Sequence, residues 1–467
     1  MKEKTEAELL AEELTYSPKH AMKQMDNSEV QAADAFCGGY MQFLNDCKTE
    51  REVTAFVQAQ AEAKGFEPFD CTKKYKTGDK VYYLNRGKAI ILTVFGKKPV
   101  TAGVRIAAAH IDSPRLDLKP NPLYEDEETA FFKTHYYGGI KKYQWTAIPL
   151  SLHGVVLLQD GSSVTVSLGE KEGEPKFVIT DLLPHLAKEQ EQRTLADGIR
   201  GEELNVLVGS RPFCTDSGSE QVKLHILKLL HDKYGMTEKD FLSAELEVVP
   251  AMPVCDIGFD RSMIGGYGHD DRVCAYPSMA AVFDAQAPEY TCLTVLTDKE
   301  ETGSDGNTGL NSAYMQYFIE DLARMEGAAG YQVLRKSKCL SADVNAAFDP
   351  TFPSVQEKRN ASFINRGVVI TKYTGARGKS GTSDACAEFM SFVRRTLDGA
   401  GVVWQQGELG AVDAGGGGTV AKYIANLDVD VVDVGVPVLS MHAPFEVVSK
   451  LDVYMAYRAF KAFFEQK

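Results

Sequence analysis

The residues of this chain that could carry chemistry are polar side chains placed directly after apolar runs. Four runs end in this way, and the polar residues that follow them are His110 with Asp112, Glu300 with Glu301, Asp343, and His442. A further acidic pair, Asp270 and Asp271, opens the helical pattern DDRVCAYPSMAAVFDA. Imidazole and carboxylate groups hold zinc in hydrolytic enzymes, where an open coordination position binds water. If these side chains meet in one place, they predict a hydrolytic zinc site.

Each of these residues, taken singly, also has an ordinary structural explanation. A lone histidine such as His110 is often a hydrogen-bonded structural residue, and His442 could belong to a loop. The pair Glu300–Glu301 could be a solvated helix start, the pair Asp270–Asp271 a helix cap, and Asp343 a turn cap. Adjacent acids at a buried strand end are unfavourable without a cation, however. The joint arrangement therefore favours a metal site.

The elements that must bring these residues together are buried strands of an α/β fold. VRIAAAH is a continuous apolar run, which is typical of a strand buried on both faces. YTCLTVLTDKEE, KCLSADVNA and VVDVGVPVLSMHA are further strand patterns that stop at polar residues and alternate with helical stretches. The carboxyl ends of parallel strands converge at one edge of a sheet, where ligands bind. We therefore expect a mixed, largely parallel sheet with helices on both faces.

The pattern changes between residues 119 and 251. Pro120 and Pro122 interrupt it, an acidic run follows, and the next segments are short and β-like, such as IPLSLHGVVLLQDG and SSVTVSLGE. Alternation of strands and helices returns near Pro250. We expect a catalytic α/β domain made of residues 1–118 and 252–467, interrupted by a mostly β insertion, 119–251, that is suited to dimerisation.

Composition limits the classes of partner. The 467 residues include 51 Lys and Arg against 65 Asp and Glu, a net charge of −14. Because an acidic surface repels phosphates and anionic lipids, we expect neither a nucleic acid nor a membrane as a partner. The apolar runs are shorter than the ~20 residues that span a bilayer. The first residues, MKEKTEAELL, lack the apolar core of a secretion signal. The nine cysteines form no CxxC pair, so we expect reduced thiols in a cytoplasmic protein.

Five motifs in a fixed order carry a family resemblance. AAHIDSPRLDLKP, GHDDR, DKEETGS, SADVN and SMHAP together resemble the aspartyl aminopeptidase (aminopeptidase I) family of dinuclear zinc exopeptidases. The resemblance extends over nearly the whole chain, including the insertion. It implies the zinc exopeptidase type of α/β fold and an aminopeptidase with two Zn²⁺ ions per subunit. Co²⁺ and Mn²⁺ accept the same ligands.

The resemblance also implies a role for each site residue. Asp270 bridges the ions, His110 and Asp343 complete one metal site, Glu301 and His442 complete the other, Glu300 is the general acid/base, and Asp112 orients His110. Asp270 is preferred to Asp271 because the family uses the first acid of this pair, usually with a cis peptide after it. Two metal ions make a bridging water acidic enough to attack as hydroxide at neutral pH.

Assembly is a further implication of the resemblance. LLPHLAKEQ, which contains His185, resembles an insertion segment that reaches into the active site of a neighbouring subunit. There His185 would donate to the developing oxyanion; the alternative is a surface or core histidine. The family forms a dodecamer built from dimers, with active sites facing an enclosed chamber.

Substrate preference depends on a cation in the pocket for the first side chain. ITKYTGARGKSGTSD offers Lys372, Arg377 and Lys379, and the alternative is an exposed basic loop. After Asp343 the chain reads VNAAFDP and lacks a histidine of the animal members, which puts a strict Asp/Glu preference in doubt. The turn at residues 415–418 is expected near the metals.

The sequence thus predicts a cytoplasmic zinc aminopeptidase that acts on peptides, with N-terminal Asp or Glu as candidate preferred residues. One alternative is a deacylase or carboxypeptidase with the same dinuclear metal centre. An alternative of another class is a non-catalytic oligomeric scaffold, against which the intact Glu300 argues, because a scaffold needs no base beside its metals.

Overall fold

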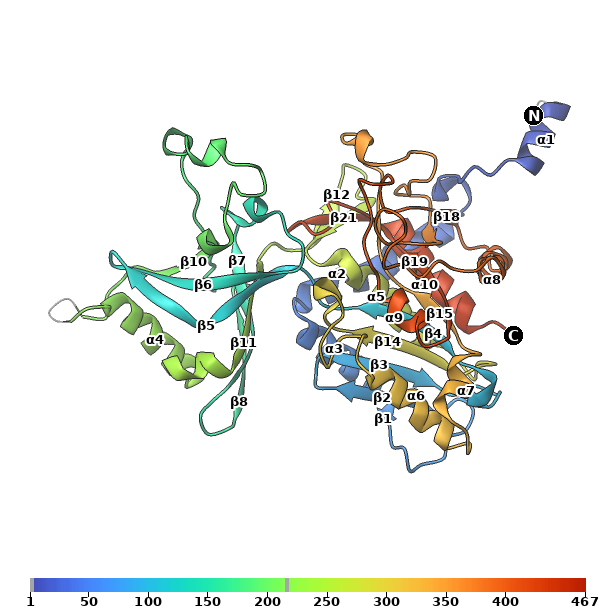
Figure 1. Ribbon diagram of the computed structural model, residues 1–467, viewed down its shortest axis with the longest axis horizontal. Coiled ribbons are helices and arrows are strands. Elements are labelled where there is room, and N and C mark those ends of the chain that lie inside the picture. Colours follow the sequence, from blue (N-terminus) through green and yellow to red (C-terminus); the bar gives the residue numbers. More distant parts are fainter. Residues whose placement is uncertain (1–3, 215–217) are drawn as a thin grey trace.

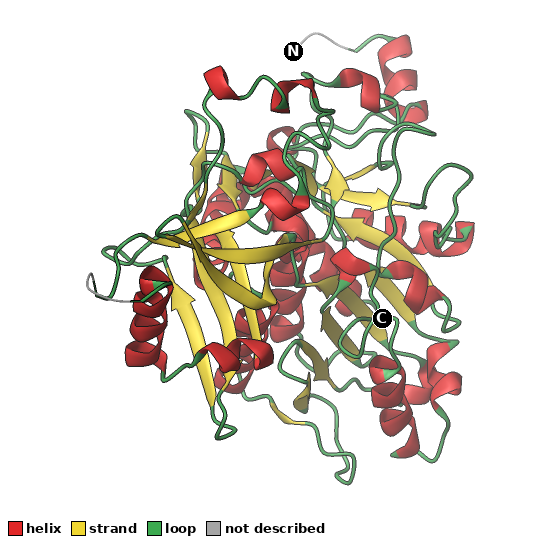
Figure 2. Cartoon of the chain, turned by 60° about the vertical axis from the view of Figure 1, so that its left-hand side comes forward, coloured by secondary structure: helices red, strands yellow, loops and turns green. Residues whose placement is uncertain are grey.

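The computed structural model describes residues 4–214 and 218–467, whose strands form three sheets (Figures 1 and 2). The largest sheet has nine strands, in the spatial order β1 (Glu67–Pro68), β2 (Lys80–Asn85), β3 (Ala89–Val94), β14 (Cys292–Thr297), β4 (Arg105–His110), β15 (Lys338–Ser341), β19 (Asp430–Gly435), β17 (Val368–Thr371) and β18 (Trp404–Gln406). Its central strands β14, β4, β15 and β19 are parallel, whereas β3 and β17 pair antiparallel with this centre. The sheet is therefore mixed and parallel at its centre, as expected.

Helices cover both faces of this sheet because successive strand side chains point to opposite sides. In β4, Ala107 and Ala109 pack in one core with five helices, while Ile106 and Ala108 pack in another with three. The first five are α2 (Asn27–Asp46), α3 (Glu50–Ala63), α5 (His269–Asp284), α8 (Ala387–Gly399) and α10 (Lys450–Phe464); the other three are α6 (Tyr314–Arg324), α7 (Gly330–Leu334) and α9 (Ala421–Ala425). The short helix α1 (Glu6–Leu14) buries none of its residues and projects from the body (Figure 1).

The second sheet forms a separate layer, at the left of Figure 1. Its spatial order is β8 (Ser163–Leu168), β7 (Leu150–Leu157), β11 (Ala244–Pro250), β5 (Arg115–Asp126), β6 (Thr129–Tyr137), β10 (Asn205–Gly209) and β9 (Val178–Ile179). All these pairings are antiparallel, and helix α4 (Gln221–Tyr234) packs against β5, β6 and β10. Most of these elements fall within residues 119–251, where the sequence predicts the β insertion, but β5 begins at Arg115, before that boundary.

A third, small sheet connects loops of the α/β domain that contains the nine-stranded sheet. It consists of β12 (Cys255–Ile257), β13 (Met263–Gly266), β21 (Glu446–Ser449), β20 (Pro437–Leu439) and β16 (Asn345–Ala346). Asp343 lies just before β16, and His442 lies in the loop between β20 and β21. The small sheet therefore fixes two of the predicted metal ligands.

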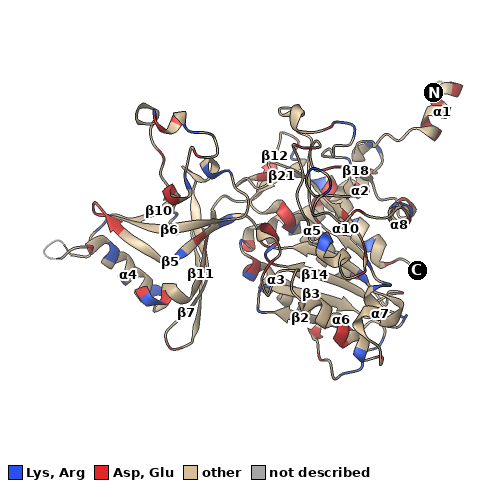
Figure 3. Ribbon diagram, viewed as in Figure 1, with Lys and Arg blue, Asp and Glu red and all other residues tan. Residues whose placement is uncertain are grey.

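Charged residues of both signs are interspersed along the ribbon (Figure 3). In the part of the chain that the structure describes, none of the helices combines the length and the apolar character needed to cross a membrane.

Candidate metal centre

The predicted ligands meet at the carboxyl edge of the central sheet. His110 is the last residue of β4 and pairs with Thr297, the last residue of the parallel strand β14. Glu300 and Glu301 lie in the short 3₁₀ turn directly after β14, and Asp343 lies just past β15. Because these strands are parallel neighbours, their ends deliver the three groups to one place.

Two groups of ligand atoms share one carboxylate. His110, Asp270 and Asp343 form one group and Asp270, Glu301 and His442 the other, with the atoms of each group within 4.8 Å of one another. His110 Nε2 lies 3.1 Å from Asp270 Oδ1, and His442 Nε2 lies 3.2 Å from Asp270 Oδ2. Each imidazole thus faces a different oxygen of Asp270, which is the arrangement that a bridging carboxylate requires.

The other ring nitrogen of each histidine is held by a main-chain carbonyl. His110 Nδ1 lies 3.0 Å from the carbonyl oxygen of Asp112, and His442 Nδ1 lies 2.8 Å from that of Gly139. A carbonyl can only accept, so Nδ1 carries the hydrogen in both rings and Nε2 is left to bind a metal. Asp112 orients His110 mainly through this carbonyl, because its carboxylate Oδ1 is 3.4 Å from Nδ1.

The Asp112 carboxylate instead organises the turn that carries both glutamates. It accepts hydrogen bonds from the backbone N–H groups of Glu300, at 3.1 Å, and Glu301, at 3.2 Å. These bonds fix the main chain at two consecutive residues, and their side chains occupy different surroundings. The side chain of Glu301 is 3% exposed and that of Glu300 is 18% exposed.

Asp270 and Asp271 are joined by a cis peptide bond, the feature that the resemblance implied. Asp270 is the member of the pair that belongs to both ligand groups. In their protonated form the imidazoles of His110 and His442 also donate from Nε2, and these hydrogen bonds lower the pKa of Asp270 and keep it a carboxylate although burial opposes ionisation. The Asp271 carboxylate is fully buried, has no hydrogen-bond partner among the described residues, and belongs to neither group.

The electrostatics of the site fit bound cations. Burial, and then repulsion from neighbouring carboxylates, raises the pKa values of Glu301 and Asp343 well above their usual range. Glu301 Oε1 and Asp343 Oδ2 are buried acceptors that no donor in the described part of the chain reaches. Buried carboxylate oxygens without donors are unfavourable unless a cation binds them. With two imidazoles beside them, they form a donor set that suits zinc.

The site opens into a cavity of about 1000 Å³. Asp270, Glu300, Glu301, Asp343 and His442 contribute to its wall. Burial is the main cause that raises the pKa of Glu300 to about 7. A cavity of this size accommodates a peptide end directly against the candidate ligands.

A family model described as aminopeptidase I zinc metalloprotease (M18) matches residues 43–464. The chain belongs to this M18 family. The expected resemblance is therefore confirmed: this M18 chain is a metallo-aminopeptidase, a hydrolase, and its family's metal is zinc.

Relatives cover almost the whole M18 chain. A probable M18 family aminopeptidase 1 from Clostridium acetobutylicum is 46% identical over 453 residues, which are 95% of this chain and 97% of the relative. The crystal structure of an M18 aminopeptidase from Thermotoga maritima has a TM-score of 0.93 at 42% identity, covering 97% of this chain and 100% of that one. A Saccharomyces structure described as the mApe1 dodecamer has a TM-score of 0.74 at 19% identity, covering 93% and 96%, and shows the likeness of fold.

The predicted substrate-binding cations do not line the large cavity of this M18 chain. Lys372 and Lys379 both pair with Asp384, at 2.5 and 2.7 Å. Arg377 and Lys379 border a small adjoining hollow of about 50 Å³, which shares Gly375 and Gly416 with the wall of the large cavity. The turn at residues 415–418 does reach the cavity, since residues 416–419 contribute to its wall.

Two other lysines, Lys141 and Lys422, do line the cavity. Neither has a carboxylate partner within 4.0 Å among the described residues. Sequence reasoning missed both. The nearest signal was the glycine-rich turn at residues 415–418, because Lys422 lies in the short helix α9 that follows it.

His185 does not reach the candidate metal centre of its own subunit. It belongs to a 3₁₀ turn of the insertion, Pro184–Leu186, is exposed, and is not among the residues that line the cavity. The same turn exposes Leu183 and Leu186. The structure therefore leaves the His185 imidazole free for contact outside the subunit.

Proposed function

We propose that this M18 chain releases the first residue of peptides by using two zinc ions bound side by side. His110 and Asp343 would hold one ion, Glu301 and His442 would hold the other, and Asp270 would be shared by both. The observation that carries the proposal is that both ligand groups share Asp270, with one imidazole facing each of its oxygens. When bound, the zinc pair supplies a Lewis acid for the scissile carbonyl and a hydroxide nucleophile at neutral pH.

Glu300 moves the protons of the reaction. It lines the cavity, its Oε2 lies 3.8 Å from His110 Nε2, and it is outside the two groups that share Asp270. A carboxylate in this place accepts a proton from water and delivers it to the leaving amine. The free α-amine of the substrate can meet the acidic wall of the cavity, which confines cleavage to the first residue.

The test compares peptides that differ only in N-terminal acetylation, with the zinc content of the enzyme measured alongside. We expect release of the first residue from the free peptide, no release from the acetylated one, and loss of activity on chelation that zinc reverses. Hydrolysis of the acetylated peptide would favour the alternative of a deacylase or carboxypeptidase. A zinc-loaded protein that hydrolyses neither peptide would favour the scaffold.

We also propose that the cavity prefers peptides beginning with Asp or Glu. Support comes from Lys422 and Lys141, cavity cations without a carboxylate partner in the described part of the chain. In Lys422→Met we expect kcat/KM for Asp-first peptides to fall about 10-fold or more and for Leu-first peptides to change little. Lys379→Met, which removes a lysine outside the cavity, is the matched control. Equal losses on both peptides would contradict this preference.

Assembly is the last part of the proposal. We propose a dodecamer of dimers in which the insertion, 119–251, makes the dimer contacts and His185 enters the site of a neighbouring subunit. The dodecameric yeast structure of the same fold and the exposed leucines beside His185 support it. All nine cysteines are free thiols, which supports action in a reducing compartment such as the cytoplasm.

A further inference from the structure

The end of strand β6 brings the insertion into contact with both halves of the metal centre. Tyr137, its last residue, donates a hydrogen bond from Oη to Asp112 Oδ2 at 2.7 Å. Two residues later, the carbonyl oxygen of Gly139 accepts the Nδ1 hydrogen of His442 at 2.8 Å. Asp112 lies on the His110 side of the centre and His442 on the other side. One short segment, residues 137–139, therefore reaches both.

Between these two contacts the segment packs against a candidate ligand. A Cβ atom placed on Gly138 would lie 3.0 Å from Glu301 Oε2 and 3.2 Å from Glu301 Cβ. Gly138 also has a φ of +75°, a conformation that side chains disfavour. Two features therefore favour glycine at this position: the positive φ of the backbone and the short distance to the Glu301 side chain.

The hydrogen bond from Tyr137 acts on a fully buried carboxylate. Asp112 is 0% exposed and already accepts from the N–H groups of Glu300 and Glu301. A buried carboxylate needs such donors, and the hydroxyl of Tyr137 supplies a charge-assisted one. Without this hydrogen bond the Asp112 carboxylate could rotate. The main-chain carbonyl that holds His110 and the 3₁₀ turn that carries Glu301 would then be held less firmly.

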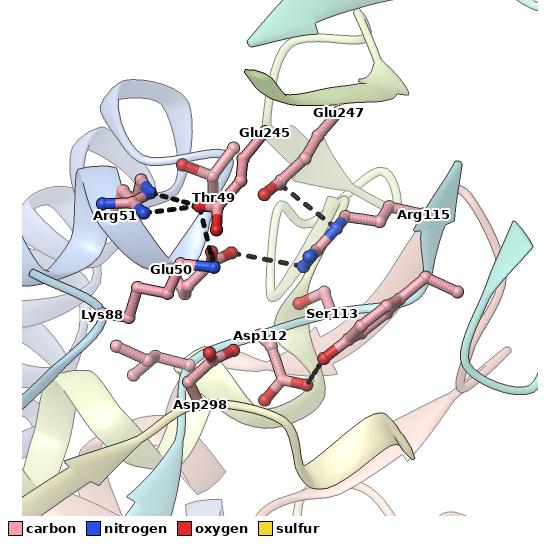
Figure 4. Close-up of polar contacts among 12 residues, drawn as sticks. Thr49, Glu50, Arg51, Lys88, Asp112, Ser113, Arg115, Glu245, Glu247 and Asp298 are labelled. Atoms are coloured by element: carbon pink, nitrogen blue, oxygen red, sulfur yellow. Dashed lines mark hydrogen bonds and ion pairs between the residues drawn. The ribbon is translucent and has the colours of Figure 1, made fainter. Parts of the chain in front are cut away.

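The ring of Tyr137 packs against Arg115, which belongs to a buried charge cluster with Glu50 and Glu247 (Figure 4). Arg115 is the cross-strand partner of Tyr137, and its guanidinium lies 3.9 Å from the centre of that ring. Arg115 also pairs with Glu50 of α3 at 3.2 Å and with Glu247 of β11 at 3.3 Å. Arg115 therefore links the ring of Tyr137 to helix α3 of the α/β domain through Glu50 and to strand β11 of the insertion sheet through Glu247.

We infer that residues 137–139 position the ligands of both metal ions, so that the insertion completes the metal centre of its own subunit. This inference rests on the proposed dinuclear site. Tyr137 is a positioning residue for Asp112 and His110, Gly138 gives Glu301 its place, and the Gly139 carbonyl orients His442. The insertion contributes none of the proposed ligands, yet it controls how tightly they bind zinc.

The experiment measures zinc transfer from the loaded, assembled protein to a colour-forming chelator. In Tyr137→Phe, which keeps the ring and loses the hydroxyl, we expect zinc affinity to fall about 10- to 100-fold, the range for lost outer-sphere partners. Tyr136→Phe alters the neighbouring, exposed tyrosine and should leave the affinity unchanged. The visible spectrum of Co²⁺-loaded Tyr137→Phe should also shift, because ligand geometry changes.

A second pair of variants tests the glycine. Gly138→Ala should weaken zinc binding, whereas Gly173→Ala should not, because Gly173 has a similar φ of +83° but nothing within 4 Å of an added Cβ. If Gly138→Ala does not fold, Tyr137→Phe decides. Wild-type zinc affinity in Tyr137→Phe, with an unchanged Co²⁺ spectrum, would overturn the positioning role and leave the proposed function standing. A wild-type protein that binds no zinc would overturn both.

Discussion

At the scale of single residues, the two adjacent glutamates for which we propose different roles occupy different surroundings. Asp112 fixes the main chain at both positions, and the two side chains then diverge. Both residues contribute to the cavity wall, but the side chain of Glu301 is almost fully buried, with Oε1 3.7 Å from His442 Nε2, whereas that of Glu300 is 18% exposed. A metal ligand should be enclosed and a proton carrier should reach the substrate, so burial matches the assigned roles.

Replacing Glu300 tests the division of tasks. Glu300→Gln keeps the shape of the side chain and removes its ability to accept a proton. We expect kcat to fall about 10²- to 10⁴-fold, with zinc content and unfolding temperature unchanged. Steady-state kinetics and metal analysis of one preparation measure both. Glu172→Gln, an exposed position in the insertion, is the control; near-normal turnover in Glu300→Gln would remove this residue from the mechanism.

At the scale of elements, the central strands were the most predictable part of the molecule. β4 and β14 are buried at every position, so both appear in the sequence as continuous apolar runs that stop at polar residues. The ends of such runs meet by parallel pairing, which is why His110, Glu301 and Asp343 could be foreseen as neighbours. The assignment of Asp270 over Asp271 needed the family resemblance, because both are acids at a helix start.

The contacts made by the insertion could not be predicted in the same way. Tyr137 looks like any aromatic residue at a strand end, and Gly139 acts through its carbonyl, which carries no side-chain signature. Lys422 follows a glycine-rich turn on a short helix, where a lysine is usually solvated. These roles depend on contacts between segments far apart in the sequence, and local patterns contain no information about them.

A buried histidine at the contact between α3 and the insertion should make the stability of the protein depend on pH. His153 of β7 is buried and lies between Glu52 of α3, at 2.8 Å, and Glu170 of the insertion, at 3.1 Å; Ser151, Lys48 and Glu247 are the other polar groups nearby. Burial opposes its charge, but the bonds to Glu170 and Glu52 raise the pKa of His153 from 6.5 to about 9. Its stabilising effect is complete below pH 6.5, the value for the unfolded chain. It is lost as the pH rises through about 9.

The stability difference between wild type and His153→Gln isolates this group. We expect the advantage of the wild type to shrink by about 3 kcal/mol between pH 6 and pH 10, measured from urea unfolding of zinc-loaded protein. His135→Gln, an exposed histidine of β6, should show no such change relative to wild type. A difference between wild type and His153→Gln that is constant across this range would show that His153 does not link the two elements through its charge.

At the scale of the whole molecule, the insertion makes contacts inside its own subunit and also presents a surface to the outside. Residues 137–139 reach the metal centre of the same subunit, while the turn with His185 points away from its own cavity. Exposed leucines flank that turn, and an apolar, solvent-facing turn beside a histidine is the composition of a contact surface. In the proposed assembly, the subunit would supply all of its own metal ligands and would receive a donor to the substrate from a neighbouring subunit.

Mixing two inactive variants tests whether His185 completes a neighbouring site. We expect His185→Ala to lower kcat about 10²-fold or more while zinc content stays the same, because a donor to the oxyanion is lost. In assemblies that contain equal amounts of Glu300→Gln and His185→Ala subunits, some sites combine an intact Glu300 with an intact His185 from a neighbour. Such mixtures should regain about a quarter of the wild-type rate when subunits assort at random.

The measurement uses co-expressed subunits with two different tags, purified through both, with the mass of the assembly checked by light scattering. If His185 served its own subunit, every site in the mixture would lack one of the two groups. The rate would then equal the mean of the two variants, however the subunits were combined. Recovery of activity above that mean requires His185 to cross a subunit boundary, and it makes assembly a condition for catalysis.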